Sequence, residues 1–300
     1  MKLQGMFAAA ATPFDHTGAI YRVKVQHNVE KWCRTALAGF VFGSPTGEGA
    51  LLDAEERVEL WKLAIPHVTA LENGNARTVI ADVTEEGVQS AARLARAAAE
   101  AGAHAVVSLV PHQYRNIMYG PEAQTLFFRA LADRSPVPVI IHNAPQWTGV
   151  DVLPETTARL SEHPNIAGVI ETGTPAGRVA QIRTQVGTGF AVLSGTECHV
   201  LESLQTGANG AVLAIASAVP YAAIALWEAF RTREEEAAID WQQRITHPGI
   251  LVTDVYGVPG LKYAMDGNGY YGGPPRLPLV PVGGEARSEI DDAFRIFQGC

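Results

Sequence analysis

The stretch Gly39 to Arg57, GFVFGSPTGEGALLDAEER, decides the fold, because it carries a short apolar run through a polar turn into a helix with an acidic first turn. A short apolar run bounded by glycine is typical of a buried strand. Asp53 is placed to cap the following helix, and Glu56, three residues later, completes a capping box. The stretch therefore predicts the strand, loop and helix of an α/β crossover.

The loop within this stretch contains Gly43 and Gly47, and glycine adopts backbone geometries that other residues avoid. Amide groups between Ser44 and Gly47, together with the Thr46 hydroxyl, can therefore converge on an anion beyond the end of the strand. The alternative is a glycine turn that only joins strand to helix. Both interpretations are open at this point.

The composition is that of a globular protein with a large core. Of 300 residues, 47% are hydrophobic and 18% are charged, which suits either one α/β barrel with an appendage or two ordinary domains. The net charge is -8 and the pI is about 5.6, and no run of Arg or Lys forms the basic patch that nucleic acid or a membrane surface requires. We therefore expect a small-molecule partner, no nucleic acid and no membrane.

The N-terminal segment and the cysteines bear on the compartment. The apolar part of MKLQGMFAAAATPFD is too short to span a bilayer and is predicted as the first strand. Cys33, Cys198 and Cys300 are odd in number and lack a C-x-x-C spacing. This usage favours a reduced, cytoplasmic compartment over a disulfide framework.

Short apolar runs alternate with Ala-, Leu-, Glu- and Arg-rich stretches of helical length, and the alternation repeats eight times. The predicted strands are Met6–Ala11, Gly39–Phe42, Arg77–Val83, Ala105–Val110, Val137–His142, Ile166–Glu171, Phe190–Ser194 and Ala211–Ala216. The predicted helices between them include Arg22–Leu37, Ala54–Val68, Glu86–Ala101, Glu122–Ala132 and Pro154–Leu160. Eight such units with nearly continuous apolar strands predict an α/β fold, the (β/α)8 TIM barrel, with a doubly wound sheet as the alternative.

After Ser217 the alternation stops and only helices are predicted. They are Ala218–Arg231, Glu234–Arg244, Val258–Asp266 and Glu285–Phe297. We expect the barrel to occupy residues 1–230 and a C-terminal helical extension to occupy residues 231–300. The Gly/Pro-rich connector Gly267–Gly284 carries hydrophobic residues that predict packing along the barrel.

Catalytic groups in such a barrel stand at the C-terminal ends of the strands and in the loops that follow. These places hold Thr12, Pro13, Ser44 to Glu48, Asp82, Pro111 to Tyr114, His142, Asn143, Ile170, Glu171, Ser194 to Glu197, Ala216 and Ser217.

A set of short motifs runs through nearly the whole chain. They are Ala11-Thr12-Pro13-Phe14, Thr46-Gly47-Glu48 with Leu52 and Glu56-Arg57, Asn143-Ala144-Pro145 with Thr148-Gly149, Leu153-Pro154-Glu155-Thr156, Pro164-Asn165-Ile166 with Gly168, Ser194-Gly195, and Gly207 with Gly210. In order and spacing the chain resembles the dihydrodipicolinate synthase and N-acetylneuraminate lyase family of class I aldolase-type barrels. The resemblance implies a small carboxylate ligand and a homo-oligomer, expected to be a homotetramer built as a dimer of dimers.

The resemblance also implies a lysine at the end of the sixth strand, which forms a Schiff base with a 2-oxo acid such as pyruvate. Ile170 stands in that position here. The five lysines of the chain are Lys2, Lys24, Lys31, Lys62 and Lys262. Lys2 precedes the first strand and the others fall on predicted helices, so none is expected at the C-terminal end of a strand, where covalent catalysis of this kind needs it.

Other positions depart from what the resemblance implies. His142 stands in place of a proton-shuttling tyrosine and Gln113 in place of a relay tyrosine, with Tyr114 one residue later. Pro45 replaces the first loop threonine, whereas the second is kept as Thr46. Trp147 takes the position of an arginine that binds a distal carboxylate in some members.

Each remaining candidate has two interpretations. His142 is an acid/base group, because imidazole titrates near neutral pH, or a structural histidine. The same choice applies to His112. Glu171 is a new base or a structural carboxylate pointing off the barrel axis, and Thr196 and Glu197 contact substrate or cap the next helix.

A metal held by His112, His142 and a carboxylate could replace the imine as an electron sink. The sequence has no metal-ligand spacing such as H-E-x-x-H. We therefore expect neither a metal nor a cofactor.

The function expected from the sequence is a cytoplasmic lyase or isomerase that acts on a small carboxylate or 2-oxo acid without a lysine Schiff base. Proton transfer is assigned to His142, assisted by Thr46, His112 and Tyr114. The residues expected to contact the substrate are Ser44, Pro45, Gly47, Gln113, Trp147, Ile170, Gly195, Thr196 and Glu197. The alternative is a catalytically silent member, a pseudoenzyme, that serves as a binding or scaffold protein.

Overall fold

The computed structural model describes residues 3–173, 175 and 177–298. Its strands follow one another in chain order around a closed barrel. They are β1 (Gly5–Ala10), β2 (Gly39–Phe42), β3 (Thr78–Asp82), β4 (Ala105–Leu109), β5 (Val139–Asn143), β6 (Ile166–Glu171), β7 (Ala191–Ser194) and β8 (Gly210–Leu213). Closure confirms the predicted (β/α)8 TIM barrel and excludes the doubly wound sheet, which has two open edges.

The strands are buried almost throughout, as their apolar sequences predict. In the register of β5 and β6, two predicted site residues are paired, His142 of β5 with Ile170 of β6.

The chain divides into two compact units. The central unit comprises Thr78–Val212 with residues 3–4, and the terminal unit comprises Gly5–Arg77 with residues 213–298. Lys2 and Cys300, which the sequence analysis considered, lie outside the described residues.

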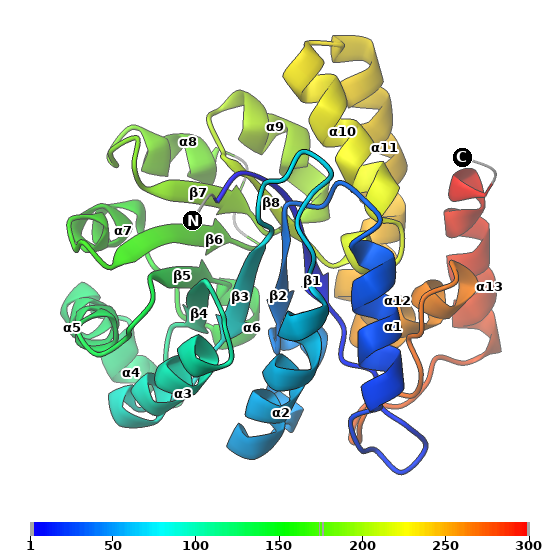
Figure 1. Ribbon diagram of the computed structural model, residues 1–300. Coiled ribbons are helices and arrows are strands. Elements are labelled where there is room, and N and C mark those ends of the chain that lie inside the picture. The colour runs from blue at the N-terminus through cyan, green and yellow to red at the C-terminus, as the bar shows by residue number, and fades with distance from the viewer. Residues whose placement is uncertain (1–2, 174, 176, 299–300) are drawn as a thin grey trace. The chain divides into compact units, whose positions relative to one another are not determined.

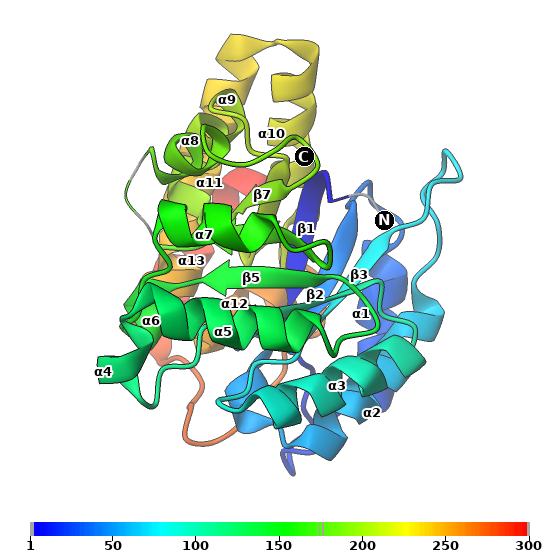
Figure 2. The ribbon, with the colours of Figure 1, turned by 90° about the vertical axis from the view of Figure 1, so that its left-hand side faces the viewer.

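The helices of the central unit cover strands β4 to β7. They are α3 (Val88–Glu100), α4 (Arg115–Met118), α5 (Pro121–Ala132), α6 (Pro145–Thr148), α7 (Pro154–Ser161), α8 (Arg178–Arg183) and α9 (Val200–Gln205). Both α5 and α7 begin with proline, whose missing N–H costs nothing at a helix start. Figure 2 shows α5 and α7 side by side along β5.

The terminal unit is mostly helical. Its helices are α1 (Arg22–Trp32), α2 (Ala54–Ala64), α10 (Pro220–Thr232), α11 (Glu235–Ile250), α12 (Gly257–Gly267) and α13 (Gly284–Phe294). The predicted capping box at the start of α2 is confirmed, since Asp53 accepts from the Glu56 amide and Glu56 accepts from the Asp53 amide. Long helices α10 and α11 pack side by side (Figure 1).

Several predicted element ends are wrong, including those of the first helix, the last strand and the helix predicted to end at Arg244. The first helix ends at Trp32 instead of Leu37, because the carbonyls that follow it turn toward the Arg77 guanidinium. The last strand ends at Leu213, and Ile215–Ser217 form a 3₁₀ turn whose Ser217 hydroxyl donates to Ala9 O. Helix α11 continues beyond the predicted end at Arg244, to Ile250, with a proline inside it.

The predicted packing of the Gly267–Gly284 connector is confirmed for its first half. Tyr270 stacks on Trp32 of α1, and the Tyr271 amide donates to Asn28 of the same helix. Leu277 and Val280, in the second half, are exposed. Within the described part of the chain, no helix has both the length and the apolar character needed to cross a bilayer.

Candidate functional site

His142, near the end of β5, is buried in the central unit. It is 7% exposed, and its Nε2 lies 3.0 Å from the Thr172 hydroxyl. Within the part of the chain that the structure describes, no group bonds to its Nδ1. Trp147 of α6 packs edge-on against the imidazole at a centroid distance of 5.8 Å. One ring nitrogen is thus held by the protein, and the other is left for another partner.

Burial lowers the pKa of His142 from its ordinary value of 6.5 to about 4, because the charged form loses its hydration. The expectation that this imidazole titrates near neutral pH is therefore wrong. At neutral pH it is uncharged, and its two ring nitrogens are one donor and one acceptor. The neutral imidazole can act as a general base but not as a general acid.

The surroundings of Ile170 are shaped by Thr172 and Gly195. Ile170 is buried on β6. Thr172 lies two residues later, and residues two apart in an extended segment point to the same face. A Cβ at Gly195 would overlap the Thr172 hydroxyl and lie 2.9 Å from Ile170 Cγ2. Glycine is thus required at position 195 to leave room for the Thr172 hydroxyl. Thr172 was not among the predicted site residues, although the two-residue period of a strand places it on the same face as Ile170.

The loop after β4 is held by Glu86. The amides of His112 and Gln113 both donate to this carboxylate, at 3.1 and 3.0 Å, and His112 Nδ1 lies 3.5 Å from it. Tyr114 immediately precedes the short helix α4, makes no side-chain capping hydrogen bond and is 67% exposed. These contacts favour the structural interpretation of His112.

Glu171 belongs to a buried polar chain. The Asn143 amide group donates to Glu171 at 3.0 Å and to Asp151 at 2.9 Å, and Arg178 pairs with Asp151 at 2.7 Å. This chain fixes the end of β6 against the loop after β5, which supports Glu171 as a structural carboxylate.

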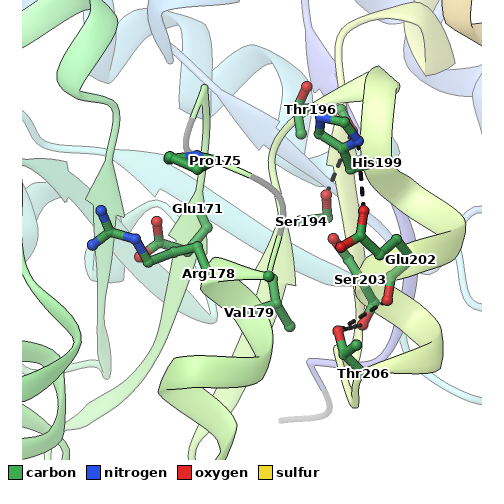
Figure 3. A pocket seen from close by; sticks show the side chains of 11 residues that line it. Glu171, Pro175, Arg178, Val179, Ser194, Thr196, His199, Glu202, Ser203 and Thr206 are labelled. Carbon is green, nitrogen blue, oxygen red and sulfur yellow. Dashed lines mark hydrogen bonds and ion pairs between the residues drawn. The ribbon is translucent and has the colours of Figure 1, made fainter.

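A small pocket opens beside this chain (Figure 3). It is lined by Glu171, Pro175, Gly177, Arg178, Val179, Ser194, Thr196, His199, Glu202, Ser203 and Thr206. Figure 3 shows Glu171 and Arg178 on one side of it and His199 and Glu202 on the other. The Thr196 hydroxyl also accepts from the Cys198 amide at 3.4 Å, as a helix cap does. Glu197 is buried and does not line the pocket.

The loop after β2 lies in the terminal unit and is tightly coiled. The amides of Gly47 and Gly49 both donate to Ser44 O, at 2.8 and 3.1 Å. The Gly47 amide is therefore unavailable for the anion site that the sequence predicted. The Ser44 hydroxyl is buried and has no partner among the described residues, so it and Thr46 are the donors left in this loop.

Glu48, at the end of the loop, contacts two residues that the sequence analysis did not connect with it. Its carboxylate lies 2.5 Å from Lys262 Nζ and accepts from the Arg276 amide at 2.7 Å. Lys262 does sit on a helix, as predicted, but its long side chain reaches a loop at the C-terminal end of a strand. No short-range sequence signal could reveal this contact, because the partners are more than 200 residues apart.

Lys262 is a poor imine former in this position. Its side chain is 1% exposed, and Nζ also donates to Pro274 O at 3.0 Å. Lys24 and Lys31 lie on α1, and Lys62 lies on α2. Among residues 3–173, 175 and 177–298, no three His, Cys, Asp or Glu side chains gather as metal ligands, which gives the metal alternative no support.

Known families, relatives and solved structures are similar to this chain over nearly its whole length. The dihydrodipicolinate synthetase family matches residues 2–296. The 4-hydroxy-tetrahydrodipicolinate synthase of an Exiguobacterium species is 32% identical over 296 residues, 98% of this chain and 97% of that protein. The crystal structure of dihydrodipicolinate synthase from Bacillus anthracis superposes with a TM-score of 0.91 at 25% identity, covering 98% of both chains.

A second solved structure is the chloride-inhibited dihydrodipicolinate synthase of Acinetobacter baumannii complexed with pyruvate, with a TM-score of 0.90, 25% identity and 98% coverage of both chains. Sequence and fold thus agree over nearly the full length, and this chain belongs to the dihydrodipicolinate synthetase family.

Proposed function

We propose that this chain is a lyase or isomerase of its family that acts on a small carboxylate of the 2-oxo acid class without forming a lysine imine. The observation that carries the proposal is the His142 imidazole, buried and uncharged, with one ring nitrogen unpartnered beside Ile170. An unpartnered buried polar atom is costly, so a ligand that bonds to it is favoured.

The proposal that no imine forms is supported by the positions of the lysines. Ile170 occupies the strand position where the resembled family carries the reactive amine, and a hydrocarbon side chain cannot form a C=N bond. Lys262, whose ammonium does reach a strand-end loop, is enclosed by Glu48 and Pro274. Activation of the ligand must then come from hydrogen bonds and a base.

In the proposed reaction His142 is the base. When Nε2–H donates to the Thr172 hydroxyl, the Nδ1 lone pair is free to accept a proton from the carbon next to the ketone of the ligand. The C–H electron pair then forms an enolate, and the proton resides on Nδ1 until it is returned to a carbon or oxygen of the ligand. We further propose, from the sequence alone, that the hydroxyls of Ser44 and Thr46 bind the ligand's carboxylate.

The second candidate is a silent member that binds the same ligands without turnover. It is favoured by the loop after β4, where Glu86 holds the His112 and Gln113 amides in a structural role. In that case His142 is a hydrogen-bonding group and never a base.

Proton exchange separates the two candidates. Pyruvate is incubated with the protein in D₂O, and loss of its methyl protons is followed by NMR. The proposal expects exchange above the buffer rate, reduced about 100-fold or more in His142→Gln, because a positioned base contributes that much. His247→Gln, an exposed histidine on α11, is the control and keeps the wild-type rate.

Two outcomes count against the proposal. Binding of pyruvate in a thermal-shift assay without any exchange supports the silent member. Exchange that is unaffected by His142→Gln assigns the base to another residue.

We also propose a cytoplasmic homotetramer, a dimer of dimers. Its support is a group of large exposed apolar side chains on and beside α4, namely Tyr114, Ile117 and Tyr119. Contiguous exposed apolar patches on a protein surface mark interaction sites.

A further inference from the structure

The loop Ser44 to Gly49 has almost no freedom of its own. Thr12 donates from its hydroxyl to Gly47 O at 2.6 Å, and a Cβ at Gly47 would lie 2.8 Å from Ala10 O. A Cβ at Gly49 would overlap Gly43 O. The loop is therefore pressed against β1 and against its own start, and small displacements of one residue move the rest.

Glu48 is the strained member of this loop. Its φ is 58°, the left-handed region that non-glycine residues avoid. Such a conformation persists only where the surroundings hold it. The surroundings here are the side chain's own contacts, because the Glu48 carboxylate is fully buried against Lys262 and the Arg276 amide.

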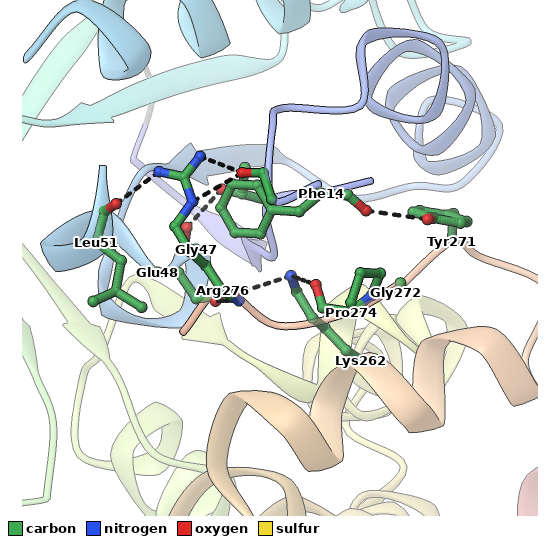
Figure 4. Close-up of polar contacts among 12 residues, drawn as sticks. Phe14, Gly47, Glu48, Leu51, Lys262, Tyr271, Gly272, Pro274 and Arg276 are labelled. Carbon is green, nitrogen blue, oxygen red and sulfur yellow. Dashed lines mark hydrogen bonds and ion pairs between the residues drawn. The ribbon is translucent and has the colours of Figure 1, made fainter. Parts of the chain in front are cut away.

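Lys262 holds Glu48 from helix α12 (Figure 4). Its Nζ is 2.5 Å from the carboxylate, 3.0 Å from Pro274 O and 4.4 Å from the centre of the Phe14 ring. Burial lowers the pKa of Lys262, and the Glu48 carboxylate opposes that effect. The Lys262 ammonium is shielded from solvent, so water cannot replace Glu48 as its partner.

Arg276 holds the other end of the same loop. Its backbone amide donates to Glu48, and its guanidinium forms a bidentate pair with Glu56 at 2.7 Å and bonds to Leu51 O at 2.7 Å. Glu56 is in the first turn of α2. Arg276, in the segment that follows α12, thus bonds both to Glu48 at the end of the loop and to Glu56 in the first turn of α2.

We infer that Lys262 and Arg276 are positioning residues for the loop that carries Ser44 and Thr46, and that both act through Glu48. The inference rests on the proposed function in one respect, the assignment of the ligand's carboxylate to this loop. The helical C-terminal extension is then a working part of the ligand site, not only a cover for the barrel.

The test uses the full chain and the variant Lys262→Met, which keeps the stem of the side chain and removes the charge. Pyruvate is the probe in a calorimetric titration well below the melting temperature. We expect its Kd to rise about tenfold or more, because a loop that must be ordered on binding lowers the affinity for the ligand. Amide exchange at Gly47 and Gly49, whose N–H groups bond to Ser44 O, should accelerate by a similar factor.

Lys31→Met is the matched control. Lys31 Nζ binds Gly269 O at 2.7 Å, so it anchors the same C-terminal segment without touching Glu48. It should lower the melting temperature and leave the pyruvate Kd and the exchange at Gly47 and Gly49 unchanged. If Lys262→Met behaves like Lys31→Met, the role of Lys262 is structural and the inference is overturned.

The double variant Lys262→Met with Glu48→Gln removes the unpaired carboxylate and keeps an acceptor for the Arg276 amide. It should recover part of the loss in both pyruvate affinity and amide protection; no recovery in either contradicts action through Glu48. If the wild type does not bind pyruvate, the proposed function fails, and the exchange rates at Gly47 and Gly49 still decide the inference.

Discussion

His142 shows how one residue's surroundings change its chemistry. Its pKa is lowered from 6.5 to about 4 by burial, so the unfolded chain binds this proton more readily than the folded chain between those values. The resulting stability is fully present above about pH 6.5 and is lost as the pH falls toward 4. We predict a contribution of about 3 kcal/mol, the shift converted at 1.36 kcal/mol for each pKa unit.

Denaturant titrations at a series of pH values measure this term. The wild type should lose stability between pH 6.5 and 4, and in His142→Gln that part of the loss should disappear. An identical pH dependence in the two proteins would show that His142 is not the group responsible.

For individual residues, the sequence predicts the position in the fold better than the pKa or the contacts of the side chain. Ile170 and His142 were placed on their strands from motif spacing, and the register sets them opposite each other. The pKa of His142 was not predictable, because burial sums contacts from many elements. The role of Thr172 was accessible from strand periodicity, whereas the contact of Lys262 with Glu48 depends on the tertiary fold.

At the scale of elements, the buried ion pair between Lys262 and Glu48 joins α12 to the loop after β2. Removing one member of such a pair leaves the other charge buried and uncompensated. We predict that Lys262→Met lowers the free energy of unfolding by about 3–5 kcal/mol.

Chemical denaturation of Lys262→Met and of the exposed control Lys62→Met measures this difference. The control should stay within about 0.5 kcal/mol of the wild type. Equal stability of the two variants would mean that the pair makes no net contribution.

Element ends were predictable where local chemistry determines them. The capping box of Asp53 and Glu56 fixed the start of α2, and it was read from the sequence. The end of α1 was not, because Arg77, immediately before β3, donates to the carbonyls of Cys33, Thr35 and Leu37. A boundary set by a residue some 40 positions away has no local signal.

At the scale of the whole molecule, the alternation of apolar strands with helical stretches was sufficient to predict the closed barrel. Strand number and order follow from local patterns, and βα units close in only a few ways. The division of the chain near residue 230 and the homo-oligomer stay predictions.

We predict a tetrameric mass by light scattering at micromolar concentration, because association would bury the exposed side chains of Tyr114, Ile117 and Tyr119. Ile117→Glu should shift the distribution toward smaller species by placing a charge in that group, whereas Glu122→Gln on α5 should not. A monomeric mass for the wild type would contradict the proposed assembly.

Borohydride trapping shows whether this family member acts without a lysine imine, as proposed. Wild type and Ile170→Lys are incubated with pyruvate, reduced, and examined by intact-mass and peptide mass spectrometry, with a family member that forms the adduct as positive control. We predict no reduced pyruvyl adduct on the wild type and an adduct at position 170 of Ile170→Lys. An adduct on any lysine of the wild type, Lys262 included, would contradict it.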